Sequence, residues 1–343
     1  MKHLLNTLYV TSQGAYLSRE GETVRVRVEN DTKLSLPIHT IGNIVCFGQV
    51  MISPPLMGLC AERGVCCSFL TMHGKFLARV EGPVRGNVLL RRAQYRQADD
   101  DHFSASAARS FVLGKVANAR QVLMRAARER TNEDDIRAFN ASVLRLAHII
   151  DETRAAGQVG AIRGKEGDAA RVYFEVFDRL LIAQKDDFVF RGRNRRPPLD
   201  NVNALLSFLY TLLVHDCRSA LEGVGLDPAV GFLHVDRPGR PSLALDLMEE
   251  LRPVIADRLA LSLINRQQVR GKGFRVTESG AVVMDDDTRK TVLVAYQERK
   301  QEEILHPFIE EKIAYGLLPH IQAQLLARHL RGDIDGYPPF FWR

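Results

Sequence analysis

The chain has 343 residues, of which 45% are hydrophobic and 26% charged, and this is typical of a globular protein long enough for two domains. Its 47 Lys and Arg residues against 41 Asp and Glu residues give a net charge of +6, which fits a phosphate-rich partner without identifying one. Because no apolar run is long enough to span a bilayer and the first residues contain no signal-peptide core, we expect an unprocessed cytoplasmic protein.

Residues 1–85 predict a β-rich domain. Over 23–29, valines alternate with charged residues, which is typical of a strand with one buried face. Short apolar runs predict further strands at 8–10, 42–47, 66–70 and 75–79, with a helix at 54–61 and a hairpin turn at His73-Gly74. The five cysteines include no C-x-x-C pair, so we interpret them as small buried side chains rather than as a zinc or redox site.

Composition changes between residues 82 and 100, where turn residues cluster and helical spacing begins. We therefore predict an α+β protein with a β-rich domain at 1–85, a linker and first helix at 86–100, and an all-helical domain at 101–343. Apolar spacing of three and four residues predicts helices at 87–97, 103–129, 133–156, 166–182, 201–222, 242–264, 288–313 and 318–331. A small hairpin is expected within 273–284. The proline-containing C-terminus is either docked through its aromatic residues or disordered.

Glu166 is the first candidate site residue in the helical part. Its ordinary explanation is an acid in the first turn of a helix, where the helix dipole favours a carboxylate. The flanking Gly164 and Gly167 weaken that explanation, because glycine lets the backbone approach a ligand closely.

The second group of candidates surrounds a Pro/Gly-rich loop. His234 follows an apolar stretch and enters this loop, although a lone histidine is more often structural. Ser242 is expected to cap the helix that follows. On that helix Asp246, Glu249 and Glu250 stand three and four residues apart, so they share a face on which like charges repel unless solvent or a cation intervenes. A solvated acidic face is the alternative, which the almost wholly apolar flanks weaken.

One imidazole with several carboxylates suits Mg²⁺ or Mn²⁺ better than zinc or copper, and such an ion can polarise a phosphodiester. Arginine-rich segments at 191–196, 237–240 and 266–275 match phosphate oxygens. Any one of them is compatible with a solvated loop, but three beside the acidic residues favour a nucleic-acid substrate. The acids at 285–287 are interpreted as a turn, and residues 270–273 lack phosphate-loop spacing.

Four segments together are similar to a known family: 164–167, 195–198 with 203–210, 231–234 and 242–253. Over essentially its whole length the chain resembles the CRISPR-associated spacer-acquisition integrase, the larger protein of the adaptation module, and most closely its subtype I-C form. The resemblance implies a β domain followed by a helical catalytic domain with divalent-metal-dependent nicking and strand transfer on DNA.

The resemblance also implies roles for particular residues. The family's metal-binding Glu, His and Asp/Glu fall on Glu166, His234 and Glu249, and its further acidic catalytic position falls on Asp246. Many relatives carry aspartate where Glu249 stands, so the sequence leaves open whether Glu249, Asp246 or both contact the metal. The candidates for DNA contact are Arg163, Lys165, Arg195, Arg196, Arg237 and Arg240.

The implied partners are double-stranded DNA, as prespacer and CRISPR repeat, a second copy of the chain paired through the β domains, and a small ferredoxin-like adaptation endonuclease that completes a heterohexamer. Two other readings of the residues stay open at this point. One is a non-catalytic nucleic-acid-binding protein. The other is a metal-dependent hydrolase of small phosphorylated molecules, against which the arginine-rich segments argue.

Overall fold

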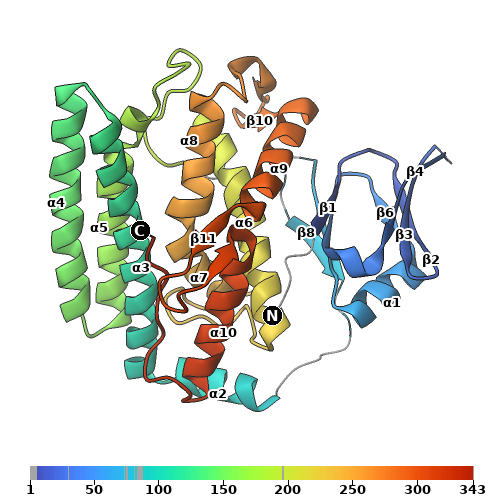
Figure 1. Ribbon diagram of the computed structural model, residues 1–343, viewed down its shortest axis with the longest axis horizontal. Helices are drawn as coiled ribbons and strands as arrows, with labels where there is room; N and C mark the ends of the chain where they lie inside the picture. The colour runs from blue at the N-terminus through green and yellow to red at the C-terminus, as the bar shows by residue number, and fades with distance from the viewer. Residues whose placement is uncertain are drawn as a thin grey trace.

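The computed structural model describes residues 6–342 apart from 30, 73, 75, 81, 83–87, 195 and 196. A β-rich N-terminal region precedes a larger helical region, so the predicted α+β class is confirmed. Figure 1 shows the N-terminal strands gathered on one side of the molecule and the long helices on the other, with the short strands β10 and β11 among the helices. The predicted boundaries at 85 and 101 stay predictions, since 83–87 lies outside the described residues, as does His73 of the predicted hairpin turn.

The described strands of the N-terminal region form two sheets of four. The first has the order β1 (Asn6–Val10), β5 (Ile41–Phe47), β7 (Cys66–Leu70) and β8 (Phe76–Val80). The second has the order β4 (Asp31–Pro37), β3 (Thr23–Val28), β2 (Tyr16–Glu20) and β6 (Met51–Ile52), and α1 (Pro54–Arg63) follows β6. The sequence did not indicate β2, β4 or the two-residue β6. The largely exposed β4 lacks the buried face that would have produced apolar alternation.

Strand β5 lies between two apolar cores. Ile44 and Cys46 pack with the second sheet and α1, whereas Val45 and Phe47 pack against the helical region. Successive side chains of a strand point to opposite faces, so a strand covered on both faces is apolar on both, as residues 44–47 of β5 are. The ring of Phe47 lies 6.0 Å from that of Phe208, which joins the sheet to the helices.

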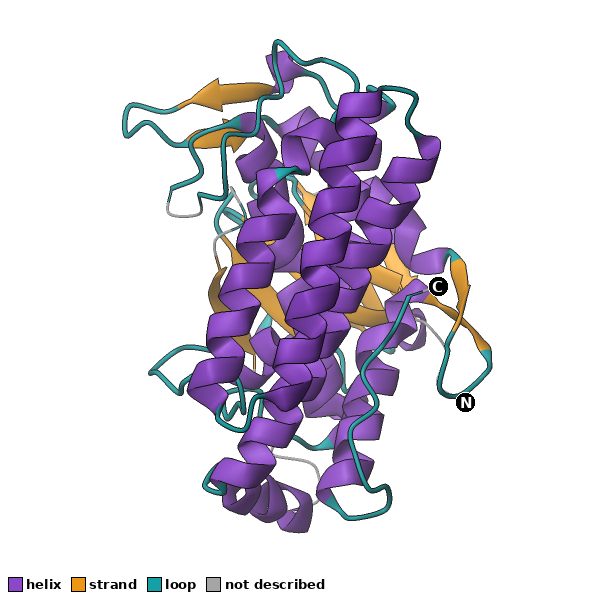
Figure 2. Cartoon of the chain, turned by 90° about the vertical axis from the view of Figure 1, so that its left-hand side faces the viewer, coloured by secondary structure: helices purple, strands orange, loops and turns teal. Residues whose placement is uncertain are grey.

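The helical region contains nine described α-helices after α1: α2 (Val88–Ala98), α3 (Asp101–Glu129), α4 (Glu133–Ala155), α5 (Val159–Glu175), α6 (Asn201–Val224), α7 (Ser242–Arg252), α8 (Arg258–Asn265), α9 (Asp286–Gln301) and α10 (Leu318–Leu330). Side chains of Asp100, Asn132, Asp200 and Asp285 accept backbone N–H groups at the starts of α3, α4, α6 and α9. Helix α3 packs against α4, α5 and α7. Figure 2 shows the long helices standing side by side in front of the strands.

Three predicted helices needed correction. The helix predicted over 242–264 is divided into α7 and α8 by a π-helical turn at Pro253–Asp257. Helix α5 begins at Val159 rather than at residue 166, so Glu166 lies in mid-helix and is not a helix-start acid. The helix predicted over 288–313 ends at Gln301, and a hairpin of β11 (Glu303–Leu305) and β12 (Lys312–Ala314) follows it. Pro307 within that hairpin explains the difference, since proline interrupts a helix.

Other expectations were confirmed. The predicted hairpin is β9 (Phe274–Val276) with β10 (Val282–Met284). Four of the five cysteines are buried, as expected for small side chains of the core, and Cys66 is partly buried. The C-terminal segment is docked, with Tyr337 and Phe340 buried in the helical core. Among the described residues, none of the helices combines the length and apolar character needed to cross a membrane.

Candidate active site

Helix α7 carries three buried carboxylates whose partners differ. Asp246, Glu249 and Glu250 are between 0% and 3% exposed, so the alternative of a solvated acidic face is wrong. Asp246 binds the loop that precedes the helix, Glu249 binds two cations, and Glu250 binds the C-terminal segment. The expected cap was also wrong, because Pro241 precedes the helix and Ser242 is its first residue, with Oγ donating to the carbonyl of Val235.

Asp246 holds the His234 loop. Its Oδ2 accepts the backbone N–H groups of Phe232 and Leu233 at 2.7 and 2.9 Å, and its Oδ1 accepts that of His234 at 2.9 Å. The Nδ1 of His234 lies 2.6 Å from the same Oδ1. A carboxylate only accepts hydrogen bonds, so Nδ1 of His234 is the donor in this contact and Nε2 is the ring nitrogen left for another partner.

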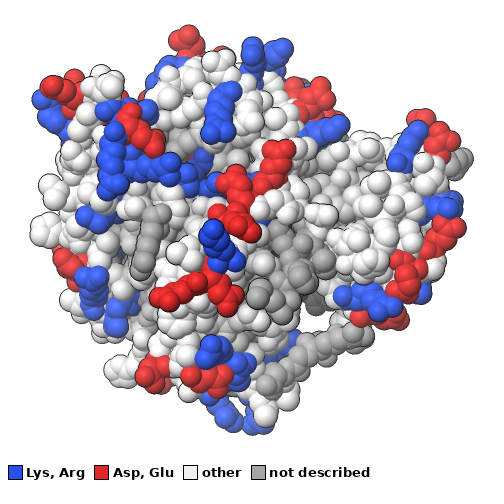
Figure 3. Space-filling view, in the orientation of Figure 1, with Lys and Arg blue, Asp and Glu red and all other residues white. Residues whose placement is uncertain are grey.

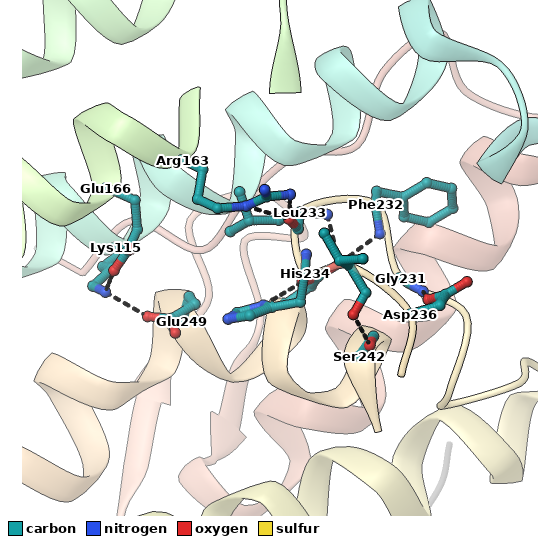
Figure 4. A network of polar contacts seen from close by, with 12 residues as sticks. Lys115, Arg163, Glu166, Gly231, Phe232, Leu233, His234, Asp236, Ser242 and Glu249 are labelled. Atoms are coloured by element: carbon teal, nitrogen blue, oxygen red, sulfur yellow. Dashed lines mark hydrogen bonds and ion pairs between the residues drawn. The ribbon is translucent and has the colours of Figure 1, made fainter. Parts of the chain in front are cut away.

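Glu166 and Glu249 meet at one ammonium group. Lys115 on α3 is 8% exposed, and its Nζ contacts Glu166 and lies 2.6 Å from Oε2 of Glu249. Figure 4 shows Lys115 between the two carboxylates and the imidazole of His234 pointing toward Glu249. Helices α3, α5 and α7 and the His234 loop thus bring together side chains far apart in the sequence.

Cations dominate the electrostatics of Glu249. Arg252 donates through Nη1 to both carboxylate oxygens, at 2.8 and 3.0 Å. Burial by itself raises the pKa of Glu249, but the charges of Arg252, Lys115 and His234 outweigh it and hold the pKa well below its ordinary value. Glu249 is therefore ionised at neutral pH and available to a cation.

Two glycines leave the backbone of α5 accessible beside Glu166. A Cβ atom at Gly164 or Gly167 would meet nothing within 4 Å, so these positions face open space and a ligand backbone can come close to the helix. On the same helix Arg163 donates two hydrogen bonds to the carbonyl of Leu233, at 2.6 and 3.1 Å. Arg163, one of the predicted DNA contacts, therefore also ties α5 to the His234 loop.

The aromatic ring of Tyr210 packs against the guanidinium groups of Arg252 and Arg193. The guanidinium carbon of Arg252 lies 4.2 Å from the ring centroid of Tyr210, and that of Arg193 lies 5.1 Å from the same ring. The hydroxyl of Tyr210 donates to Asp257 at 2.5 Å. Arg193 also donates to Asn203 at 2.6 Å, so this member of the predicted phosphate-binding segment is engaged inside the protein.

The remaining basic candidates are dispersed. Arg195 and Arg196 lie outside the described residues. Lys165 pairs with Glu152 at 2.9 Å, whereas Arg237 is exposed on the loop after His234, and Arg240 on that loop is partly buried. Figure 3 shows Lys and Arg side chains gathered over the helical region near α4 and α8, with acidic side chains among them.

The donor set fits a divalent cation. No three His, Cys, Asp or Glu side chains in the described part of the chain form a ready metal cage. The carboxylates of Glu166 and Glu249 nevertheless both contact the ammonium group of Lys115, close to the imidazole of His234. Carboxylate oxygens with one imidazole nitrogen suit Mg²⁺ or Mn²⁺. Both oxygens of Asp246 are occupied by N–H donors, which favours a positioning role for this residue over direct metal binding.

Neither Lys115 nor Arg252 was predicted from the sequence as a residue of the site. A signal for Lys115 was present, because it is a lone charge on a stripe of apolar residues that includes Phe111 and Val122. A charged residue at such a position needs a buried counter-charge, which indicates a site.

Comparison with known proteins gives consistent matches. A family model described as CRISPR associated protein Cas1 matches residues 8–298. "CRISPR-associated endonuclease Cas1 1" of Chlorobaculum tepidum is 57% identical over 343 residues, which is all of both chains. Among solved structures, a casposase bound to integration product is similar with a TM-score of 0.84 and 20% identity over 99% of this chain and 95% of that chain. A Cas6-RT-Cas1–Cas2 complex matches with a TM-score of 0.83 and 20% identity, over 100% of this chain and 36% of that chain.

Proposed function

This chain belongs to the CRISPR-associated protein Cas1 family, and from that membership we propose that it is a divalent-metal-dependent DNA endonuclease and strand transferase that inserts short DNA fragments as new spacers into a CRISPR array. Its relative in Chlorobaculum tepidum is named an endonuclease. We also propose that the protein is of the subtype I-C kind. The observation that carries the proposed activity is the meeting of Glu166 and Glu249 at one cation beside His234.

Each residue of the site has a proposed task. Glu166, Glu249 and His234 would hold Mg²⁺ or Mn²⁺, and the bound ion would supply a Lewis acid for the phosphodiester. Asp246 fixes the tautomer and the orientation of His234 through Nδ1. Arg252 keeps Glu249 ionised and oriented. The bare surface of α5 at Gly164 and Gly167 leaves room for a DNA backbone beside Glu166.

The proposed reaction is a transesterification. The 3′-hydroxyl of the incoming DNA attacks a phosphorus atom at the CRISPR repeat, one P–O bond forms, and another breaks to release a new 3′-hydroxyl. The number of phosphodiester bonds is conserved, so no energy-rich cofactor is needed. With water in place of the 3′-hydroxyl the same site hydrolyses the phosphodiester, which accounts for an endonuclease activity.

The proposed partners follow from the family and its structural neighbours. A casposase of the same fold is bound to an integration product, and a Cas1 chain of the same fold is found in a complex with Cas2. We expect this chain to bind double-stranded DNA, to pair with a second copy through its β domain, and to form a heterohexamer with a small ferredoxin-like partner. Arg163, Lys165, Arg237 and Arg240 remain proposed DNA contacts, with Arg195 and Arg196.

Strand transfer tests the proposed function directly. A short duplex with free 3′-hydroxyls is incubated with a repeat-containing plasmid, the small partner and Mg²⁺ or Mn²⁺. Glu166→Gln, His234→Ala and Glu249→Gln are expected to lose integration, as is the wild-type protein with excess chelator. The matched control is Asp168→Asn, which changes a half-exposed acid on the same helix. Integration at wild-type rate by all three folded variants would show that the proposed site is wrong.

A further inference from the structure

Lys115 lies at the point where the proposed metal ion has to bind. Its ammonium group contacts Glu166 and Glu249 together, and its stem is buried along α3. Burying a lone ammonium is costly, so its place in the fold depends on these two carboxylates. Lys115 and Arg252 together supply two positive charges against the two negative charges of Glu166 and Glu249.

A divalent ion held by the same two carboxylates conflicts with this arrangement. Mg²⁺ binds oxygen at about 2.1 Å, so its ligands must close around a point that the ammonium now shares. The ion would also lie within a few ångströms of Nζ, where like charges repel strongly in a poorly hydrated site. Ion and ammonium therefore compete for the same oxygens.

The structure also offers the ammonium another position. Lys115 lines a small cavity together with Tyr173, Tyr210, Arg252 and Asp257. The buried hydroxyl of Tyr173 lies there close to the carboxylate of Asp257. Burial raises the pKa of Tyr173 well above its ordinary value, and the neighbouring charge of Asp257 adds to this rise. A phenol oxygen and a carboxylate are both acceptors for a lysine that leaves Glu166 and Glu249.

We propose that Lys115 is a displaceable internal cation, which bridges Glu166 and Glu249 in the metal-free protein and moves toward Tyr173 and Asp257 when a divalent ion binds. This inference rests on the proposed function, since it requires the ion to bind at Glu166 and Glu249. It assigns to Lys115 two effects: it stabilises the metal-free site against carboxylate repulsion, and it weakens the affinity for the ion. Lys115 is thus a positioning residue that sets the metal concentration at which the site fills.

The test is a measurement of Mn²⁺ affinity by the electron paramagnetic resonance signal of free Mn²⁺, with the full chain and without DNA. Lys115→Met is expected to bind Mn²⁺ about 10-fold more tightly than the wild-type protein, because a competing cation is removed. Thermal unfolding is followed in parallel, and added Mn²⁺ is expected to raise the Tm of this variant by more than that of the wild-type protein. Lys300→Met is the matched control, since it removes another buried lysine, paired with Asp216 at 3.0 Å, and should leave Mn²⁺ affinity unchanged.

The outcomes separate the two proposals. If the wild-type protein binds Mn²⁺ and Glu166→Gln does not, but Lys115→Met binds it no more tightly than wild type, the displacement is wrong and the metal site stands. If neither the wild-type protein nor Lys115→Met binds Mn²⁺, the metal site fails and the displacement fails with it. Should the variant not fold, a crystal structure of the wild-type protein with Mn²⁺ decides: an ammonium still in contact with both carboxylates overturns the displacement.

Discussion

The replacement Asp246→Asn separates a positioning role from direct metal binding. The native carboxylate accepts three backbone N–H groups and one imidazole N–H, and it is fully buried. Asparagine keeps the shape but has one oxygen and one NH₂ group. With the NH₂ at the Oδ2 position, the N–H groups of Phe232 and Leu233 lose their acceptor. With the NH₂ at the Oδ1 position, the N–H of His234 loses its acceptor and the ring must protonate Nε2 instead, which removes the lone pair that a metal needs.

Both orientations of the amide are costly. One or two buried N–H groups are left without a partner, at about 1–3 kcal/mol each, so we expect the free energy of unfolding to fall by about 2–5 kcal/mol. For a helical region of this size the change corresponds to a fall in Tm of about 4–10 °C. If Asp246 acted only as a metal ligand and held no N–H groups, its replacement by asparagine would lower Mn²⁺ affinity without lowering the Tm of the metal-free protein.

The assay combines thermal unfolding without metal, Mn²⁺ binding and strand transfer on the same preparations. Asp236→Asn is the matched control, since this exposed loop aspartate accepts only the N–H of Gly231 at 3.3 Å among the hydrogen bonds described for it. We expect the control to unfold and react as the wild-type protein does, and Asp246→Asn to lose stability, Mn²⁺ affinity and strand transfer together. A variant with wild-type Tm in the absence of metal would refute the positioning role.

Three further predictions concern helix α7, the loop that precedes it and the C-terminal segment. Burial raises the pKa of Glu250 from 4.5 to about 7 despite hydrogen bonds from Tyr337, Gln322 and Phe340, so the unfolding free energy should fall by about 3 kcal/mol as pH rises from 4.5 to 7. Glu250→Gln should flatten this part of a pH series of urea midpoints, and an unchanged pH dependence would contradict the assignment. Gly231→Ala places a Cβ 2.8 Å from Oδ2 of Asp246, so we expect it to lower the Tm and to abolish strand transfer, and activity at wild-type level would show that the loop can shift. Phe340→Ala should cost about 3–5 kcal/mol in urea unfolding because the ring is fully buried, whereas the half-exposed Phe341→Ala should cost much less, and equal losses would mean that the segment is not docked as described.

The helices and the choice of candidate residues were largely predictable from the sequence, because both depend on local patterns. Apolar spacing over 103–129 and 201–222 located α3 and α6 to within two residues at each end. The alternation of valines with charged residues over 23–29 correctly predicted that the valines of β3 face the core. Where the local pattern was weak, as in the exposed β4, or where a proline interrupted it, as after α9, the prediction missed the element.

The different roles of the three acids on α7 could not be predicted from the sequence. Their spacing shows that they share a helix, but it does not show which neighbouring residues each carboxylate contacts. Asp246, Glu249 and Glu250 lie within five consecutive positions, yet they face a loop, two cations and the C-terminal segment. The sequence by itself determined which residues carry charge and which helices carry them. Only the tertiary structure placed Lys115 between Glu166 and Glu249, since α5 and α7 both pack against α3, which carries the lysine. A buried charge requires a counter-charge, and the packing of the three helices decides which one is within reach.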